Sequence, residues 1–337
     1  MQAFLVDRYG KSGNTRIGEA PVPAVGEHDV LVQVHAASVN PVDFKIRDGE
    51  LKQVLRFHLP LILGNDLAGV VTQVGAKVTR FRPGDAVYGR PDKSRIGAFA
   101  EFIAMREADV ARKPANTTML EAASLPLVGL TAWQALVERA NVQPGQTVLI
   151  HAGSGGVGTF AIQLAKHLGA TVATTTGTTN VEMVKRLGAD IVVDYKKERF
   201  EDVLRDVDVV LDTLGPENVA KSFRVMKPGG KLISISGPPD PAFAREFGLG
   251  WPLEQAMRLL SWRTRRQARQ HGVSYSFLFM RPDGEQLQQI TALVEAGIIQ
   301  PVIDQVFPFA QTQEALAYVE TGRAKGKVVI QVLDDAG

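Results

Sequence analysis

The 337-residue sequence contains no cysteine. Disulfide bonds, thiolate metal ligands and a cysteine nucleophile are therefore excluded. Histidine is also scarce, and the six histidines are not grouped at the spacing of metal ligands. We interpret them as structural or exposed side chains.

A strong charge of one sign and long apolar runs are absent as well. The 38 basic and 36 acidic residues leave a net charge of +2 without a block of like charges, so neither nucleic acid nor an anionic membrane is indicated as a partner. The longest uncharged segment, between Arg139 and Lys166, holds Pro144, His151 and several glycines, unlike a membrane-spanning helix. Charges within residues 1–8 begin too early for a secretory signal, so we expect a cytoplasmic protein with no membrane segment.

The length of the chain predicts two domains. Residues 1–125 contain short apolar or alternating runs between turns, which predict a β-rich domain with strands at 29–35, 67–74, 85–88 and 99–105. Residues 126–300 alternate between helices and strands, which is typical of a doubly wound parallel sheet in an α/β fold. Residues 301–337 return to short strands around one helix, 312–321, and end in a strand at 327–332 that we expect to rejoin the first domain.

The predicted parallel sheet has six strands, with helices between them. We expect strands at 147–151, 171–175, 191–194, 208–212, 231–236 and 275–279, and helices at 159–168 and 180–187. A further helix is predicted from Trp251 to Gly272, and it carries five arginines at positions 258, 263, 265, 266 and 269. This helix is a candidate phosphate or partner site and a candidate wall of the substrate cleft, although a solvated helix face is the simpler interpretation.

A glycine-rich turn joins the first of these strands to the following helix. The spacing Gly153-x-Gly155-x-x-Gly158 permits a sharp turn, a close approach of backbone N–H groups to a pyrophosphate, and tight packing of the helix on the strand. The helix N-terminus adds unpaired donors and a favourable dipole. The segment therefore predicts a dinucleotide-binding loop made of Gly153, Ser154, Gly155, Gly156, Val157 and Gly158.

The position that selects the nicotinamide cofactor contains hydroxyls instead of a carboxylate. About 20 residues past the glycines, an NAD-binding fold normally carries an acidic residue. Here residues 174–180 include Thr176 and Thr178, and no carboxylate occurs until Glu182. Hydroxyls can donate to a 2′-phosphate, with Lys185 or Lys196 adding positive charge, so we expect NADPH. The alternative is that these threonines merely suit a strand end.

Further cofactor contacts are expected at the carboxyl ends of the later strands, where doubly wound sheets bind their ligands. The residues predicted on this basis are Leu214, Gly215, Ser236, Gly237, Phe277 and Phe279.

Several motifs, in order along nearly the whole chain, resemble the quinone oxidoreductase and zeta-crystallin branch of the medium-chain dehydrogenase/reductases. The longest is the pattern of Gly, Gln, Leu and Lys residues over 145–166, and shorter matches lie at 40–47, 63–69, 83–87, 129–132 and 325–328. The resemblance implies a GroES-like catalytic domain interrupted by a Rossmann domain, with the active site in the cleft between them. It also implies a homodimer joined through the edge strand at 275–279.

The sequence departs from the zinc-dependent alcohol dehydrogenases of this superfamily. The resemblance places Asn40 and Asn65 at their metal-binding Cys and His positions, and the cysteine cluster of their structural zinc is missing. Neutral amides are poor zinc ligands, so no catalytic zinc is expected. Without a metal to stabilise an alkoxide, the site is better suited to an acceptor that takes hydride directly, namely a quinone or an α,β-unsaturated carbonyl.

The resemblance implies roles for a few residues of the substrate site. Asn40 and Lys45 are the candidate donors to the developing oxyanion, and Lys45 or solvent supplies the proton. Thr131 matches a position near the nicotinamide. Asn40 as a turn cap, Lys45 as a surface charge and Thr131 as a helix N-cap are the alternatives.

Three more residues are assigned as follows. Tyr195 resembles a tyrosine beside the adenosine 2′-phosphate, or else packs at a strand end, and Lys327 is a candidate cofactor contact. Asp43 is interpreted as a structural residue that pairs with Lys45 or Arg47.

The function expected from these features is a metal-independent, NADPH-dependent oxidoreductase acting on quinones or activated alkenes. An enoyl-thioester reductase, in which the arginine-rich helix receives a substrate phosphate, is one alternative. A non-catalytic NADPH-binding protein, as among zeta-crystallin relatives, is the other.

Overall fold

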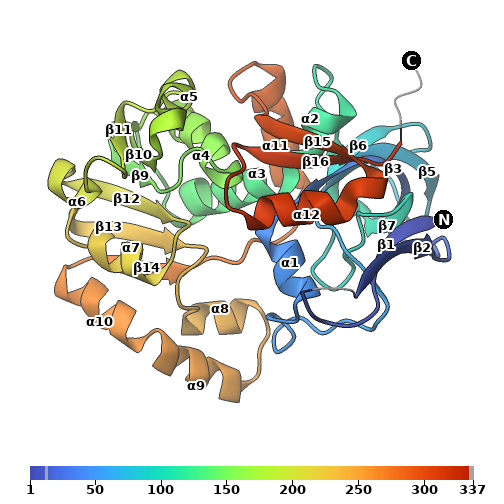
Figure 1. Cartoon of the computed structure of the whole chain (residues 1–337), viewed down its shortest axis with the longest axis horizontal. Coiled ribbons are helices and arrows are strands. Elements are labelled where there is room, and N and C mark those ends of the chain that lie inside the picture. Colours follow the sequence, from blue (N-terminus) through green and yellow to red (C-terminus); the bar gives the residue numbers. More distant parts are fainter. Residues whose placement is uncertain (12–13, 334–337) are drawn as a thin grey trace. The chain divides into compact units, whose positions relative to one another are not determined.

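The computed structural model describes residues 1–11 and 14–333. The chain divides into two compact units, one formed by Met1–Leu130 with Arg281–Gly337 and the other by Thr131–Met280 (Figure 1). No helix in the described ranges is long and apolar enough to cross a bilayer.

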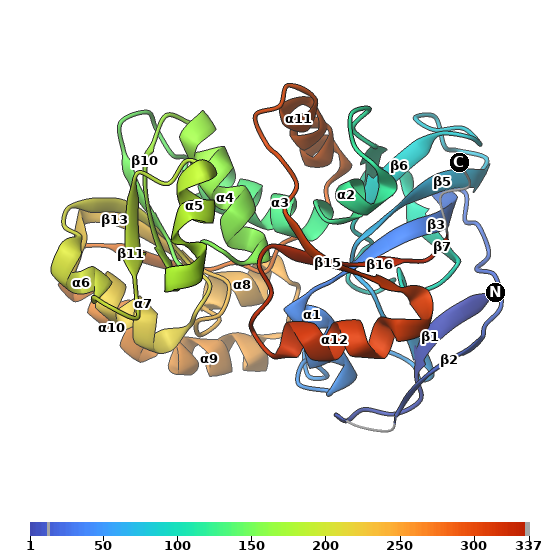
Figure 2. The ribbon, with the colours of Figure 1, turned by 45° about the horizontal axis from the view of Figure 1, so that its top comes forward.

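The first unit is built on two β-sheets. A three-stranded sheet has the order β2-β1-β4, and a seven-stranded sheet has the order β15-β16-β3-β5-β6-β8 with β7 paired to β3. The chain returns to this unit at its end, because β16 pairs antiparallel with β3 and places Val328 opposite Val39. Figure 2 shows α12 lying along β15 and β16. The strands are β1 (Gln2–Val6), β2 (Thr15–Glu19), β3 (Asp29–Val39), β4 (Leu61–Ile62), β5 (Leu67–Val74), β6 (Ala86–Gly89), β7 (Phe102–Arg106), β8 (Val110–Arg112), β15 (Ile303–Pro308) and β16 (Lys327–Gln331), and the helices are α1 (Pro41–Arg47), α2 (Met119–Ala123), α11 (Gly284–Glu295) and α12 (Thr312–Glu320).

The first boundary lies after Leu130, near the predicted 125, whereas the second lies after Met280 and not at 300, because α11 packs on the first unit. The Tyr88 hydroxyl of β6 donates to the Leu287 carbonyl of α11 at 2.6 Å. A Cβ on Gly284 would lie 2.4 Å from the Val110 carbonyl of β8, so only glycine permits this close contact. Residues 281–300 therefore belong with the β-rich unit and not with the parallel sheet.

The second unit contains one parallel sheet of six strands. Its order is β11-β10-β9-β12-β13-β14, which is the dinucleotide-binding order 3-2-1-4-5-6, and every pairing is parallel. This confirms the predicted doubly wound parallel sheet. The strands are β9 (Thr147–Ile150), β10 (Thr171–Thr176), β11 (Ile191–Asp194), β12 (Val207–Asp212), β13 (Met226–Ser234) and β14 (Ser274–Phe277), and the helices are α4 (Gly156–His167), α5 (Val181–Arg186), α6 (Phe200–Val203), α7 (Pro216–Ser222), α8 (Pro241–Glu246), α9 (Trp251–Leu260) and α10 (Trp262–Gln270).

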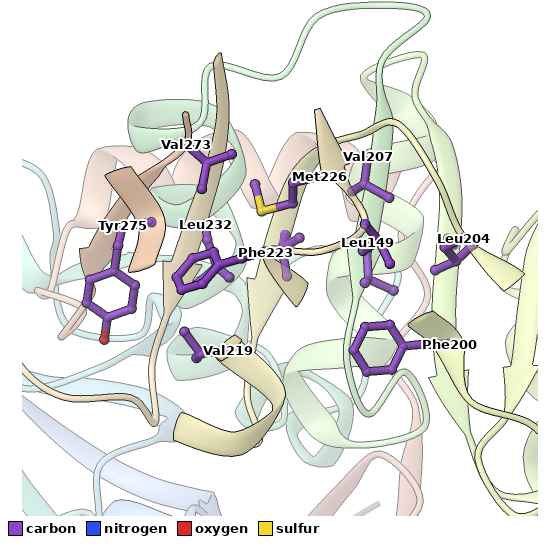
Figure 3. Packing of buried hydrophobic residues seen from close by; sticks show 14 of the residues in the cluster. Leu149, Phe200, Leu204, Val207, Val219, Phe223, Met226, Leu232, Val273 and Tyr275 are labelled. Carbon is purple, nitrogen blue, oxygen red and sulfur yellow. The ribbon is translucent and has the colours of Figure 1, made fainter. Parts of the chain in front are cut away.

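One face of this sheet is buried under helices. Figure 3 shows Leu149 of β9 and Leu232 of β13 in the same apolar cluster as Val219 of α7, Phe223 directly after α7 and Phe200 of α6. Side chains on a strand alternate between faces, so the preceding Val148 and the following Ile150 point to the other side of β9, and both are also fully buried. A strand buried on both faces is the reason that the sequence shows apolar runs here instead of alternation.

The predicted single helix from Trp251 to Gly272 is wrong. The segment forms α9 and α10, separated at Ser261. The Ser261 hydroxyl donates to the Met257 carbonyl at 2.7 Å and accepts from Arg265 Nε at 3.0 Å, so its side chain competes for backbone partners at the break.

Two other predictions also need correction. A helix does not begin at Thr131, because α3 (Pro126–Trp133) already contains it and a π-helical stretch at Gln134–Arg139 continues it. The alternative interpretation of Thr131 as an N-cap is therefore wrong. Strand β14 ends at Phe277, so Phe279 lies beyond it.

Candidate functional site

The glycine-rich loop leaves the carboxyl end of β9 through a strained residue. Ala152 has a φ of 51°, a left-handed conformation that is costly for a residue with a Cβ. A Cβ on Gly153 would lie 2.1 Å from Thr174 Oγ1, and one on Gly158 would lie 2.4 Å from the Ala152 carbonyl oxygen. Both glycines are therefore required by contacts within the protein itself.

Gly155 differs from these two glycines because nothing in the protein requires it to lack a side chain. A Cβ there would meet only the Ala152 carbonyl oxygen, at an ordinary 3.4 Å. Gly155 is the N-cap of α4, with a φ of −83° and no side-chain cap for the helix N-terminus. The space beside Gly155 and the uncapped start of α4 together fit the pyrophosphate of a dinucleotide.

The end of β10 offers one buried hydroxyl without a partner. Thr174 Oγ1 donates to the Ile150 carbonyl, and Thr175 Oγ1 accepts from the Ala152 amide. Thr176 is 1% exposed, yet its Oγ1 has no hydrogen-bond partner in the part of the chain that the structure describes. Such an orphaned polar atom normally has a ligand or water to bind, and it fits the predicted adenosine ribose site.

The structure brings a carboxylate to this position that the sequence analysis missed. Asp194 ends β11 in register with Thr176. The Thr178 hydroxyl donates to Asp194 Oδ2 at 2.7 Å, and this hydrogen bond lowers the pKa of the Asp194 carboxyl. Thr178 is therefore committed as a donor within the protein, and Lys197 lies 3.5 Å from the same carboxylate. The signal was present in the sequence, because the ends of neighbouring parallel strands meet at one edge of the sheet.

Two other predicted residues, Tyr195 and Ser154, are connected to the same loop. The Tyr195 side chain is 64% exposed, and a Cβ on Gly177 would lie 3.4 Å from its hydroxyl. Asn180 Nδ2 donates to Ser154 Oγ at 3.2 Å and so links this loop to the glycine-rich loop.

A buried aspartate organises the loops that follow β12 and β13. Asp212 accepts hydrogen bonds from the amides of Leu214 and Gly215 and from the Ser234 hydroxyl, while burial raises the pKa of its carboxyl. Ser234 Oγ in turn accepts from the amides of Gly237 at 2.7 Å and Ser236 at 3.2 Å. The four predicted residues of these loops are thus held by a side-chain pair that the sequence analysis did not identify.

The two predicted phenylalanines belong to an aromatic cluster. The rings of Phe277 and Phe243 lie 5.1 Å apart, and those of Phe279 and Phe247 lie 5.2 Å apart, with both partners at α8. The Phe277 carbonyl accepts from Arg139 at 3.0 Å. The side chains therefore pack against α8, and any cofactor contact here falls to the backbone.

In the first unit, Asn40 is the N-cap of α1 and is 1% exposed. Its Nδ2 donates to Asp66 Oδ2 at 2.8 Å and to the Ser38 carbonyl at 3.3 Å, and its Oδ1 accepts from Lys327 Nζ at 2.6 Å. Both N–H groups of the amide are thus used, so the geometry does not support the predicted role of Asn40 as an oxyanion donor.

Asp43 does not pair with Lys45 or Arg47, contrary to expectation. Its Oδ2 accepts from the Asn40 amide and its Oδ1 from Asn65 Nδ2, both at 2.7 Å. The carboxyl is fully buried, and this burial raises its pKa to about 7. Arg47 instead pairs with Asp48 and Glu320, each at 2.8 Å.

Lys45 and Thr131 are the remaining predicted residues of the substrate site. The half-buried Lys45 ammonium makes no hydrogen bond or ion pair with the residues that the structure describes. Thr131 is 3% exposed, within the body of α3.

Lys327 and Asn65 show why the metal position does not fit zinc. Lys327 is 5% exposed and donates to three acceptors within the first unit, one of them on Asn40. Asn65 Nδ2 is bound to Asp43, while its Oδ1 has no partner within residues 1–11 and 14–333. The Lys327 ammonium contacts Asn40, one of the two residues that the resemblance places at zinc-ligand positions.

The comparisons with known proteins match this architecture. Residues 26–115 match the family described as alcohol dehydrogenase GroES-like domain, and residues 187–330 match zinc-binding dehydrogenase. The chain is 35% identical to the mitochondrial NAD(P)H oxidoreductase RTN4IP1 of Danio rerio, over 99% of this chain and 92% of that protein. It is also 35% identical to the chloroplastic NADPH-dependent alkenal/one oxidoreductase of Arabidopsis thaliana, over 98% of this chain and 79% of that protein. The quinone oxidoreductase structure from Coxiella burnetii superimposes with a TM-score of 0.87 at 31% identity and 99% coverage of both chains.

Proposed function

Because the chain belongs to the medium-chain dehydrogenase/reductases, with their GroES-like and zinc-binding dehydrogenase domains, we propose that it is an NADPH-dependent, metal-independent reductase of quinones or α,β-unsaturated carbonyls. Membership of the oxidoreductase class is common to the relatives named above. The choice of acceptor, of cofactor and of a metal-free mechanism is our proposal.

The observation that carries the proposal is the contact of Lys327 Nζ with Asn40 Oδ1 at 2.6 Å. A dehydrogenase that oxidises alcohols uses its zinc ion to stabilise an alkoxide. A divalent ion would be repelled by the ammonium group, and amides bind zinc poorly. A carbonyl-activated alkene or a quinone needs no alkoxide, so reduction of such an acceptor suits these residues.

The glycine-rich loop supports a pyridine nucleotide as the second reactant. Reduced nicotinamide supplies a hydride when it is bound. In the second unit, the space beside Gly155 and the start of α4 would hold the pyrophosphate, and Thr176 would bind the adenosine ribose.

The first unit supplies the groups that would donate a proton to the reduced substrate. When hydride adds to the acceptor carbon, negative charge develops on the substrate oxygen, and a positioned donor lowers the barrier. Lys45 is our candidate, because its Nζ carries no other described bond, and solvent is the alternative donor.

We propose that the cofactor is NADPH and not NADH, although one feature of the site opposes this choice. Thr176, Lys196 and Lys197 favour a 2′-phosphate, whereas the Asp194 carboxylate beside them favours a ribose hydroxyl. Titration of both cofactors tests the choice, and Asp194→Asn is expected to shift preference further toward NADPH.

A panel of acceptors tests the reaction. The purified chain is mixed with NADPH and a quinone, a free enone or an enoyl thioester, and the loss of nicotinamide absorbance is followed. Turnover of the quinone or enone supports the proposal. Preference for the thioester would favour the enoyl-thioester reductase, and NADPH binding without any turnover would favour a non-catalytic protein.

We also propose a homodimer joined at β14, which is the edge strand of the six-stranded sheet. An open strand edge is a natural pairing surface. Light scattering at low protein concentration gives the mass directly, and a monomer would count against the proposal.

A further inference from the structure

A buried ionic cluster lies in the first unit. We call it the Lys327 cluster, and it consists of Lys327, Asp66, Asn40 and Ser38. Asp66, Ser38 and Asn40 are at most 1% exposed, and Lys327 is 5% exposed. Such burial of charge is costly unless every donor and acceptor is satisfied.

Lys327 satisfies all three of its N–H groups inside the protein. Its Nζ donates to the Val39 carbonyl at 3.0 Å, to Asn40 Oδ1 at 2.6 Å and to Asp66 Oδ2 at 3.2 Å. Three acceptors require the protonated ammonium, because a neutral amine has only two N–H bonds. Burial lowers the pKa of Lys327, while Asp66 opposes this shift.

Asp66 is equally saturated. Its Oδ2 accepts from the Ser38 hydroxyl at 2.8 Å, from Asn40 Nδ2 at 2.8 Å and from Lys327. Its Oδ1 accepts from the Leu127 amide at 2.7 Å. Four donors thus surround the Asp66 carboxylate, and Lys327 and Asp66 form an ion pair in which both partners are hydrogen-bonded.

The cluster connects three elements that carry the proposed site residues. Lys327 opens β16, Asn40 caps α1, and Leu127 is the second residue of α3. Lys45 lies on α1 and Thr131 on α3. The ion pair thus fixes the start of both helices through Asn40 and through the Leu127 amide.

We propose that Lys327 is a positioning residue, whose buried ammonium takes over the organising role of the catalytic metal and holds α1 and α3 in register, and that it does not contact the cofactor. The inference deepens the proposed function and rests on it. A metal ion organises a site by binding its ligands, and here Lys327 binds Asn40 and the Asp66 carboxylate instead. Residues of this kind orient the groups that act on the substrate. Their substitution commonly lowers activity although they do not contact the substrate themselves.

The test compares K327M, the double variant K327M/D66N and the control K325M. Lys325 is exposed and lies two positions away, so its loss should leave every readout unchanged. K327M leaves Asp66 as an unpaired buried charge and should lower the Tm markedly, whereas K327M/D66N removes both charges and should recover part of that loss.

Cofactor binding and turnover are then measured on the folded double variant. We expect its NADPH Kd to stay within about twofold of the natural chain, while kcat falls about tenfold or more because the two helices lose their common anchor. A large rise in the NADPH Kd would identify Lys327 as a cofactor contact and overturn the proposal. An unchanged kcat would mean that the cluster only stabilises the fold, and this result would also overturn the proposal.

These outcomes are separable from failure of the proposed function. If the natural chain reduces no acceptor, the proposed reaction fails and the positioning role fails with it. The Tm difference between the single and double variants then still reports whether Lys327 and Asp66 form a coupled pair.

Discussion

Replacement of Gly155 by alanine separates cofactor binding from folding. Gly155 caps α4 with a φ of −83°, which alanine adopts without strain, and the added Cβ would meet only the Ala152 carbonyl at 3.4 Å. The methyl group would fill the space in which we place the pyrophosphate. We therefore expect Gly155→Ala to fold normally and to bind NADPH weakly.

The sizes of both effects follow from the local geometry. Alanine is a poorer N-cap than glycine, which lowers the free energy of unfolding by about 0.5 kcal/mol. Alanine also restricts the unfolded chain more than glycine does, which raises the free energy of unfolding by about 0.4–1 kcal/mol. The two effects nearly cancel, so the free energy of unfolding should change little. Loss of one or two charge-assisted hydrogen bonds to phosphate costs about 1.5–3 kcal/mol, which is a rise of about tenfold to a hundredfold in Kd.

Two other glycines serve as matched controls. Gly250→Ala changes a glycine N-cap on α9, where the new Cβ would meet only Pro252 at 3.7 Å, so both stability and NADPH affinity should be kept. Gly158→Ala would place a Cβ 2.4 Å from the Ala152 carbonyl oxygen, and we expect it to destabilise the fold by about 1–3 kcal/mol.

The assay pairs urea denaturation with NADPH titration by fluorescence. If Gly155→Ala binds NADPH as tightly as the natural chain while folding equally well, the loop does not hold the pyrophosphate. If Gly158→Ala is as stable as Gly250→Ala, the close contacts that we describe do not constrain the loop.

Three further predictions concern pH, the buried hydroxyl and metal. The Asp43 carboxyl has a pKa of about 7 in the folded protein against an ordinary 3.8, so its contribution to stability is fully present below about pH 4 and is lost as the pH rises toward 7. Asp43→Asn should therefore decrease the difference between the free energies of unfolding at about pH 5 and about pH 8, measured by urea denaturation. If that difference is unchanged, the raised pKa of Asp43 is contradicted. Thr176→Val should keep the Tm, because it replaces an unpartnered hydroxyl, and should raise the NADPH Kd about tenfold; a lower Tm would mean that the hydroxyl has a structural partner. Dialysis against a chelator should leave turnover intact, and loss of activity that zinc restores would refute the metal-free mechanism.

Local sequence patterns fixed most of the architecture in advance. The apolar runs of β9 and β12 and the glycine spacing at 153–158 follow from backbone geometry and burial, both of which act over a few residues. The break at Ser261 was missed, because a helical pattern continues on both sides and only the side-chain hydrogen bonds reveal the interruption.

Only part of the candidate site could be predicted from local sequence patterns. The cofactor loop is one continuous segment, so its residues could be named from their spacing. The carboxylates of Asp194 and Asp212 enter the site from strand ends that become neighbours only when the parallel sheet forms.

The sequence alone determined that this chain forms a β-rich unit and a dinucleotide-binding sheet, because periodicity and glycine chemistry are local properties of the backbone. The tertiary structure decided which charged group contacts Asn40. Lys327 and Asn40 are 287 residues apart, and they meet only because β16 pairs with β3. No local pattern encodes such a contact, since the stability of a buried charge depends on every donor and acceptor that the folded chain gathers around it.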